Sequence, residues 1–212
     1  WTNPPSAQTL RTNTPRTPLP FPAMARLRRY QANQTYSLMR RTSERRYFLV
    51  ANRFTRQLFF YLLGYHQELF PTIAIHGFCA LSTHYHKQST TKHTDNQPSD
   101  LGGFMRGFNS LAARAINVKL GRGENLWRVG KYNAVLTKGL TAVERQWLYI
   151  AVQAVRAGMV RWPRDNPGAY IPPEWFGTTR TFHRPKGAFF GGVRNKKADG
   201  DASEPLDLFG YQ

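Results

Sequence analysis

Two histidines separated by one residue stand in the segment His84-Tyr85-His86. The flanking residues favour a strand, and side chains two positions apart on a strand point to the same face of a sheet. Two neutral imidazoles on one face can share a divalent metal ion, so this pair is the first candidate for chemistry. The alternative is a pair of exposed strand histidines without a ligand. The other histidines match no ligand spacing and are interpreted as structural or surface residues: His66, His76, His93 and His183.

Hydrophobic periodicity predicts the elements that must hold this pair. The strand candidates are residues 35–40, residues 72–81, a return strand that begins at His84 and fades early into the polar run 87–90, and residues 126–137. The helix candidates are residues 51–69, residues 101–120, and residues 141–157, where Thr141 and Glu144 match a capping box. The order strand, helix, strand, strand, helix, strand, helix predicts an α+β fold. Its core is a ferredoxin-like split βαβ unit, with an extra C-terminal helix and extended termini.

Composition limits the class of protein. The chain has 212 residues, of which 41% are hydrophobic, and this is enough to build a packed core. No apolar run approaches the roughly 18 residues that a membrane span needs, so no membrane partner is expected. The single cysteine, Cys79, excludes an intrachain disulfide framework and a thiolate zinc cluster. Four segments are expected: a Thr/Pro-rich basic arm at 1–23, a core at 24–160, a basic aromatic extension at 161–197 and an acidic tail at 198–212.

The charge balance indicates a polyanionic partner. Lys and Arg number 30 against 12 Asp and Glu, which gives a formal net charge of +18. This excess is typical of nucleic-acid binding, because Lys and Arg neutralise phosphates. The expected nucleic-acid contacts are Arg26, Arg28, Arg29, Arg40, Arg41, Arg45, Arg46, Arg161, Arg164, Arg180, Arg184 and Lys186. Aromatic residues alternate with the later ones, and they either stack on unpaired bases or pack the segment onto the core: Trp162, Tyr170, Trp175, Phe176, Phe182, Phe189 and Phe190.

Several ordered blocks then point to one family. They are Met24–Tyr30 followed by Thr35-Tyr36, Glu44–Phe48, His76–His86, Leu111–Asn117 followed by Gly123–Trp127, Val155–Val160, Trp162-Pro163 and Arg184–Phe190. Over residues 24–190 the chain resembles the HUH-type single-tyrosine transposases, in particular the REP-associated tyrosine transposase branch. The resemblance implies that a divalent metal on His84 and His86 polarises a phosphate of single-stranded DNA. It also implies that a helix tyrosine attacks that phosphate and becomes joined to the 5′ end, next to a hairpin that basic surface recognises.

The sequence departs from that pattern at the expected nucleophile. The resemblance implies a tyrosine on the central helix, at about residues 104–119, but Ala112 or Ala113 stands in its place. Asn117 is the only polar candidate for a third metal ligand on that helix. Tyr85 is expected to point away from the histidines, and Tyr149 is interpreted as a packing residue on an apolar helix face. The prediction is therefore a fold that has lost its strand-transfer chemistry, with no cofactor unless catalysis survives, in which case Mg or Mn is expected.

Three functions compete at this stage. The first is a non-catalytic nucleic-acid-binding protein, with RNA favoured over DNA. It would be a component of a large ribonucleoprotein such as an organellar ribosome, with neighbouring proteins as further partners and a mitochondrial or other organellar location. The second is an active metal-dependent enzyme that nicks hairpin-flanked single-stranded DNA, in a bacterial cytoplasm. It would need an unusual nucleophile, such as Tyr149 or a metal-activated water. The third is a protein that only bridges other proteins. Whether the chain is an enzyme stays open, and the missing helix tyrosine favours that it is not.

Overall fold

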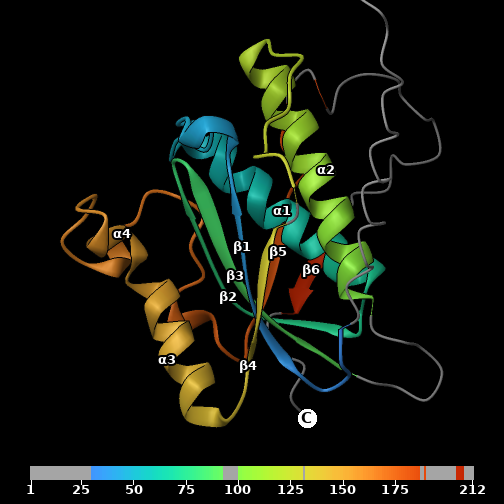
Figure 1. Cartoon of the computed structure of the whole chain (residues 1–212). Coiled ribbons are helices and arrows are strands. Elements are labelled where there is room, and N and C mark those ends of the chain that lie inside the picture. The colour runs from blue at the N-terminus through green and yellow to red at the C-terminus, as the bar shows by residue number, and fades with distance from the viewer. Residues whose placement is uncertain (1–29, 93–99, 131, 187–188, 190–203, 208–212) are drawn as a thin grey trace, which may run out of the picture.

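The computed structural model describes residues 30–92, 100–130, 132–186, 189 and 204–207. The core elements follow the predicted order (Figure 1): β1 Thr35–Arg41, α1 Arg53–Leu69, β2 Ile73–Leu81, β3 His84–Thr91, α2 Leu101–Leu120 and β4 Asn133–Thr137. After them come α3 Leu140–Ala151, α4 Gln153–Arg156 and the strands β5 Thr179–Phe182 and β6 Glu204–Asp207. Short 3-10 turns lie at Ser43–Arg45, Pro163–Asp165 and Pro173–Trp175. The arm 1–23 lies outside the described residues, and of the tail 198–212 only β6 is described.

The four core strands form one antiparallel sheet in the order β2-β3-β1-β4. This is the strand order of a ferredoxin-like split βαβ unit, so the predicted fold class is confirmed. The strand that carries the two histidines is an inner strand, paired on one side with β2 and on the other with β1. In the register, His84 lies opposite Arg41, and His86 lies opposite Met39 on β1 and Cys79 on β2.

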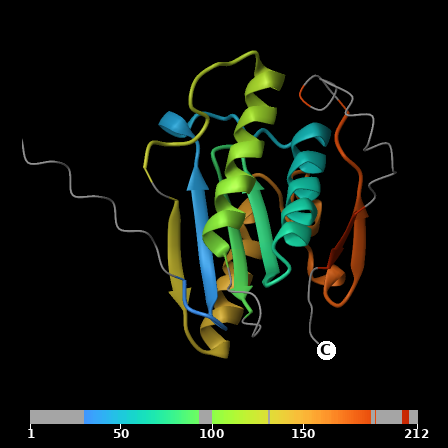
Figure 2. The ribbon, with the colours of Figure 1, turned by 90° about the vertical axis from the view of Figure 1, so that its right-hand side faces the viewer.

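Helices cover both faces of the sheet. The helices α1 and α2 lie side by side on one face, and α3 lies on the other (Figures 1 and 2). The main core fills the space under α1 and α2 with buried aromatic and aliphatic side chains, among them Phe59, Phe78 and Phe108. Local signals fix these helices. The side chain of Asn52 accepts a hydrogen bond from the Thr55 amide at 2.9 Å at the start of α1, and α2 ends at Gly121, where φ is 64°.

A second, smaller core lies under α3. It consists of Cys79, Leu81, Ile150, Ala151, Ala154 and Tyr170. The segment that carries Tyr170 runs along the outer edge of β2. The Ala80 amide donates to the Ala169 carbonyl at 2.9 Å, and the Ile171 amide donates to the Phe78 carbonyl at 3.0 Å. The chain after α4 is therefore fixed to the sheet, beside the strand that neighbours the histidine strand.

The prediction that the histidine strand fades at residues 87–90 is wrong. β3 continues to Thr91, and Lys87, Gln88 and Ser89 are fully buried within it. As an inner strand it has ladder partners on both sides, and some of its polar side chains also find partners. Gln88 Nε2 donates to the Val143 carbonyl at 2.9 Å, and the Thr90 hydroxyl bonds the Thr35 hydroxyl at 2.7 Å. The metal-ligand candidates therefore lie on a full-length strand.

The last strand and the last helix also differ from the prediction. β4 covers only Asn133–Thr137, because the chain turns at Gly130, and Trp127 makes only an isolated bridge with Thr42. The third helix begins at Leu140, after Gly139, whose φ of 81° suits glycine, so the Thr141 capping box does not form. The helix is interrupted at Val152, which separates α3 from α4. None of the described helices is long and apolar enough to span a membrane.

Candidate active site

The two histidines lie on the face of the sheet that α3 covers. Their ring centroids are 5.0 Å apart, which confirms that they share one face. The ring of Tyr149, on α3, lies 5.6 Å from the ring of His86, and the two ring planes are nearly perpendicular, at 87°. The structure therefore brings His84, His86 and Tyr149 together, from β3 and from α3.

Tyr149 lies at the histidines and not in the core under α3. Its side chain is 38% exposed, whereas the next residue, Ile150, is buried in the core under α3. The Arg156 guanidinium lies 5.3 Å from the Tyr149 ring centre, so a cation stands beside the aromatic ring. Consecutive helix residues point about 100° apart, and this rotation separates the buried Ile150 from Tyr149. The sequence patterns did not indicate that α3 covers the face of the sheet to which the histidines point.

The central helix cannot supply a nucleophile to these histidines. Ala112, fully buried, and Ala113 both lie on α2, on the opposite face of the sheet. Tyr85 marks that face, because its ring packs on Phe108 and its hydroxyl donates to Asn109 Oδ1 at 2.7 Å. Burial raises the pKa of Tyr85, so this phenol stays neutral. The expectation that Tyr85 points away from the histidines is confirmed, and a tyrosine at the expected position on α2 would point away from them too.

Asn117 is not placed to complete a metal site. It lies near the end of α2, where its Nδ2 donates to the Glu124 carbonyl at 2.6 Å. The helix places it across the sheet from the histidines, so it cannot share a cation with them. Within the described part of the chain, no group of three or more His, Cys, Asp and Glu side chains is arranged to hold a metal ion.

The electrostatics keep both imidazoles neutral near pH 7. Burial lowers the pKa of His84, and the Arg41 guanidinium lowers it further. Burial also lowers the pKa of His86 to about 4, with His84 and Arg41 as the next causes. A neutral imidazole keeps one nitrogen lone pair for a metal ion. On His84 the Nδ1 atom already bonds the Thr83 hydroxyl at 2.9 Å, which leaves Nε2 for a ligand.

A basic cavity of about 250 Å³ lies beside the histidine pair, at the ends of β1 and β4. Three arginines line it, Arg40, Arg41 and Arg128, together with Asn133. Arg41 stands opposite His84 in the β1–β3 register, so the cavity and the histidines are neighbours. Guanidinium groups recognise phosphate oxygens through paired hydrogen bonds. The arrangement places a guanidinium group that can bind phosphate beside the two imidazoles and the Tyr149 ring.

The other predicted nucleic-acid contacts lie in separate places. Arg45 and Arg46 are exposed on the 3-10 turn after β1, and Arg46 Nε is paired with Glu44 at 2.8 Å. Arg161 and Arg164 lie near the exposed ring of Trp162. The remaining ones that are described are exposed on the C-terminal segment: Arg180, Arg184 and Lys186. Arg26, Arg28 and Arg29 lie outside the described residues.

The C-terminal aromatics divide between the two expected roles. Trp175 and Phe182 pack on Phe60 of α1, and Phe189 packs against the main core. These three confirm the packing interpretation for their part of the segment. Tyr170 is buried in the core under α3. In contrast, Trp162 is 51% exposed and Phe176 is 41% exposed, so their rings are open to a ligand. Phe190 lies outside the described residues.

Comparisons with known proteins place the fold. The chain matches no family model and no curated protein. One similar solved structure is a REP-associated tyrosine transposase bound to a REP hairpin, with a TM-score of 0.53 and 18% identity over 67% of this chain and 79% of that chain. Another is a candidate transposase from Deinococcus radiodurans, with a TM-score of 0.39 and 16% identity over 69% of this chain and 99% of that chain. The second score is too low to carry an argument. From the first, the chain has the fold of a REP-associated tyrosine transposase.

Proposed function

We propose that this chain binds single-stranded DNA and cleaves it through a covalent bond to Tyr149. The observation that carries the proposal is the contact of Tyr149 with His86, whose neighbour His84 shares the same face of β3. A tyrosine hydroxyl beside two metal-binding imidazoles is a combination suited to phosphoryl transfer. The likeness to a transposase bound to a DNA hairpin supports the choice of substrate.

The residues fit a divalent cation. His84 and His86 are neutral and adjacent, and Mn²⁺ accepts imidazole as well as oxygen ligands. Gln153 would supply the third ligand, because it is a buried amide one helical turn after Tyr149. Its Nε2 donates to the Tyr149 carbonyl at 3.0 Å, so its amide nitrogen is engaged. Its amide oxygen is the type of hard ligand that Mg²⁺ and Mn²⁺ bind.

The reaction follows from these placements. A Mg²⁺ or Mn²⁺ ion held by the histidines would polarise the scissile phosphate as a Lewis acid. Arg41, which lines the basic cavity and lies opposite His84 in the register, would hold the phosphate. The Tyr149 hydroxyl loses its proton and its oxygen bonds to phosphorus, while the bond from phosphorus to the 3′ oxygen breaks. The 3′ oxygen leaves and takes a proton, so the upstream part of the strand ends in a free 3′ hydroxyl. The downstream part stays on Tyr149 through its 5′ phosphate, as a phosphotyrosine.

The test is capture of the covalent adduct. The full chain is incubated with hairpin-flanked single-stranded DNA and Mn²⁺, and a denaturing gel separates free DNA from protein-linked DNA. We expect an adduct with the wild-type chain and none with Tyr149→Phe, which removes only the hydroxyl group. Tyr47→Phe is the matched control, because Tyr47 is 74% exposed and lies outside the site. An adduct of undiminished yield with Tyr149→Phe would reject the assignment.

A second candidate is the non-catalytic role that the sequence favours, RNA binding within a large ribonucleoprotein of an organelle. The net charge of +18 and the exposed arginines outside the site support it, because sequence-independent phosphate contacts need no reaction. Sequencing of the nucleic acid that co-purifies with the native protein separates the two candidates. A defined structural RNA in a large particle, together with no DNA adduct, would favour the second. Hairpin-bearing DNA would favour the first.

A further inference from the structure

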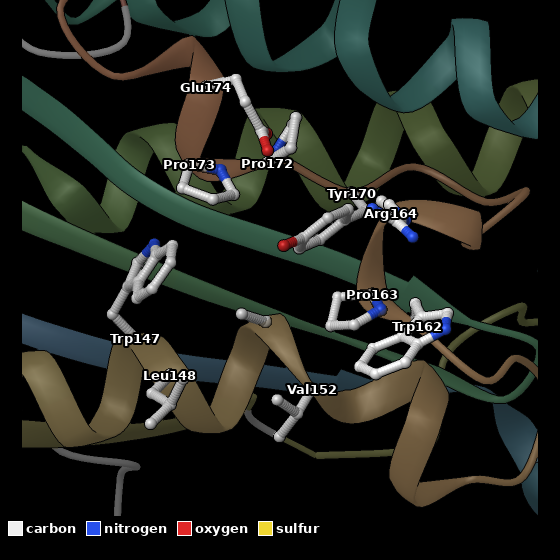
Figure 3. A pocket seen from close by; sticks show the side chains of 11 residues that line it. Trp147, Leu148, Val152, Trp162, Pro163, Arg164, Tyr170, Pro172, Pro173 and Glu174 are labelled. Atoms are coloured by element: carbon white, nitrogen blue, oxygen red, sulfur yellow. The ribbon is translucent and has the colours of Figure 1, made fainter.

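A pocket of about 430 Å³ lies between α3 and the C-terminal segment (Figure 3). This volume falls within the range of small-ligand pockets, roughly 300–1,000 Å³. Figure 3 shows Trp147 at one end and Trp162 at the other, with Tyr170 between them and Glu174 above. Three prolines complete the wall, so the pocket is framed by rings. The pocket is thus a flat-walled aromatic slot with a few polar groups.

The polar groups in the slot offer both kinds of hydrogen bond. In Figure 3 the Tyr170 hydroxyl points into the space between the two tryptophans, and the Glu174 carboxylate borders the same space. Burial, with Glu174 and Cys79 as further causes, raises the pKa of Tyr170 to about 12, so its hydroxyl stays protonated and donates. A carboxylate accepts hydrogen bonds. A planar ligand that carries an acceptor and an amino group on its edge would satisfy both residues.

Cations stand at the rim of the same slot. The guanidinium groups of Arg161 and Arg164 lie 5.8 and 5.9 Å from the ring centre of Trp162. A half-exposed tryptophan ring flanked by two arginines can stack on a base while the arginines contact the phosphates on either side of it. Aromatic faces, edge hydrogen-bond partners and rim cations together match a nucleotide of a single strand.

We propose that this pocket binds one unpaired base of the DNA strand whose phosphate lies at Tyr149. The proposal rests on the proposed function for the identity of the strand. Leu148 and Val152 line the pocket, and Tyr149, between them in sequence, contacts His86, so the pocket and the histidine site are close neighbours along the chain. A strand that crosses α3 at this point reaches both sites. The captured base therefore lies close in sequence to the cleaved bond.

Glu174 sets the preference among the bases. Cytosine and adenine carry exocyclic amino groups that donate to a carboxylate, and guanine carries an amino group as well. Thymine has no amino group to donate. The pocket therefore accepts cytosine, adenine or guanine in preference to thymine at one position of the strand.

The test measures binding without cleavage. The dissociation constant of the full chain is measured, in metal-free buffer at one salt concentration, for hairpin-flanked DNA strands that each lack one base. We expect one position at which loss of the base weakens wild-type binding about 5- to 150-fold, the range for one base–aromatic stack. Trp162→Ala should weaken binding of the intact strand by a similar factor and show no further loss at that position. Glu174→Gln should reduce the discrimination against thymine there.

The controls separate this proposal from the proposed function. Tyr47→Ala removes an aromatic ring that is outside the pocket and more exposed than that of Trp162, and it should leave all dissociation constants unchanged. Thermal melting shows whether Trp162→Ala is folded, as its half-exposed position predicts. The base pocket would be overturned if the binding free energies lost by Trp162→Ala and by removal of a base added up at every position. It would also be overturned if Trp162→Ala bound the intact strand like the wild type. The binding assay does not depend on cleavage. If one position shows no further loss with Trp162→Ala but no adduct forms at Tyr149, the pocket is supported and the nucleophile is rejected.

Discussion

At the scale of single residues, burial of the Lys87 amine reduces the free energy of unfolding. Its side chain is fully buried, and Nζ lies 3.3 Å from the Phe104 ring centre and 3.9 Å from the Met105 sulfur. Neither partner is a carboxylate, so burial lowers the pKa of Lys87 well below its usual value. The folded chain therefore favours the neutral amine, whereas the unfolded chain binds a proton at any pH below about 10.4.

We predict that Lys87→Met stabilises the fold at pH 7 by about 1–3 kcal/mol, the range for a buried polar group without full compensation. The unfolded wild-type chain binds more protons than the folded one between the lowered pKa and about 10.4, so wild-type stability rises with pH across that window. The gain from the variant should therefore shrink between pH 7 and pH 10. Urea unfolding at the two pH values measures it, and an equal gain at both would argue against a lowered pKa.

At the scale of elements, α1 and α2 pack closely where Gly107 faces His66. A Cβ atom added at Gly107 would lie 2.6 Å from His66 Nε2. His66 cannot move away easily, because it is buried and its Nδ1 bonds the Leu62 carbonyl at 2.8 Å. The absence of a side chain at Gly107 thus sets the distance between the two helices.

Gly107→Ala should destabilise the fold by about 1–3 kcal/mol, the usual cost of overpacking, although alanine has the higher helix propensity. Chemical unfolding measures the change. Gly123→Ala is the matched control, since an added Cβ there meets no atom within 4 Å. A neutral or stabilising Gly107→Ala would show that the helices separate without cost.

Local sequence patterns were sufficient for most elements but not for the site. The periodicity of residues 51–69 and 101–120 predicted α1 and α2 because their apolar stripes face one core. The polar run 87–90 predicted an early end of the histidine strand. The strand continues because β1 and β2 pair with it on both sides, and these partners lie far away in the sequence. His84 and His86 were found from their spacing alone. Tyr149 was considered as a nucleophile but a packing role was favoured, because its contact with His86 depends on which face of the sheet α3 crosses, and no local pattern encodes that choice.

At the scale of the whole molecule, charge dominates the expected binding. The net charge is +18, and described arginines lie, among other places, at the histidine site, on the 3-10 turn after β1 and around Trp162. A single strand that contacts several of these places releases counterions from each contact. Its affinity therefore falls steeply as the salt concentration rises.

We predict that the double variant Arg45→Glu and Arg46→Glu reduces the slope of log affinity against log salt by about 1.4, the value for two phosphate contacts with a single strand. Fluorescence anisotropy over a salt series measures the slope. The variant with both residues changed to lysine keeps the charge and should keep the slope. A slope that stays unchanged on charge reversal would place the strand away from this turn.

The backbone bonds that tie Ala169 and Ile171 to β2 have a consequence for length measurement. The same strand β2 pairs with β3, which carries the histidines. The C-terminal segment that lines the base pocket and the strand that carries the histidines are therefore held by one sheet. If the pocket holds a base while Tyr149 contacts the phosphate to be cut, the distance between that base and that phosphate is fixed. The molecule would then act as a ruler, cutting at a constant number of nucleotides from the base it holds.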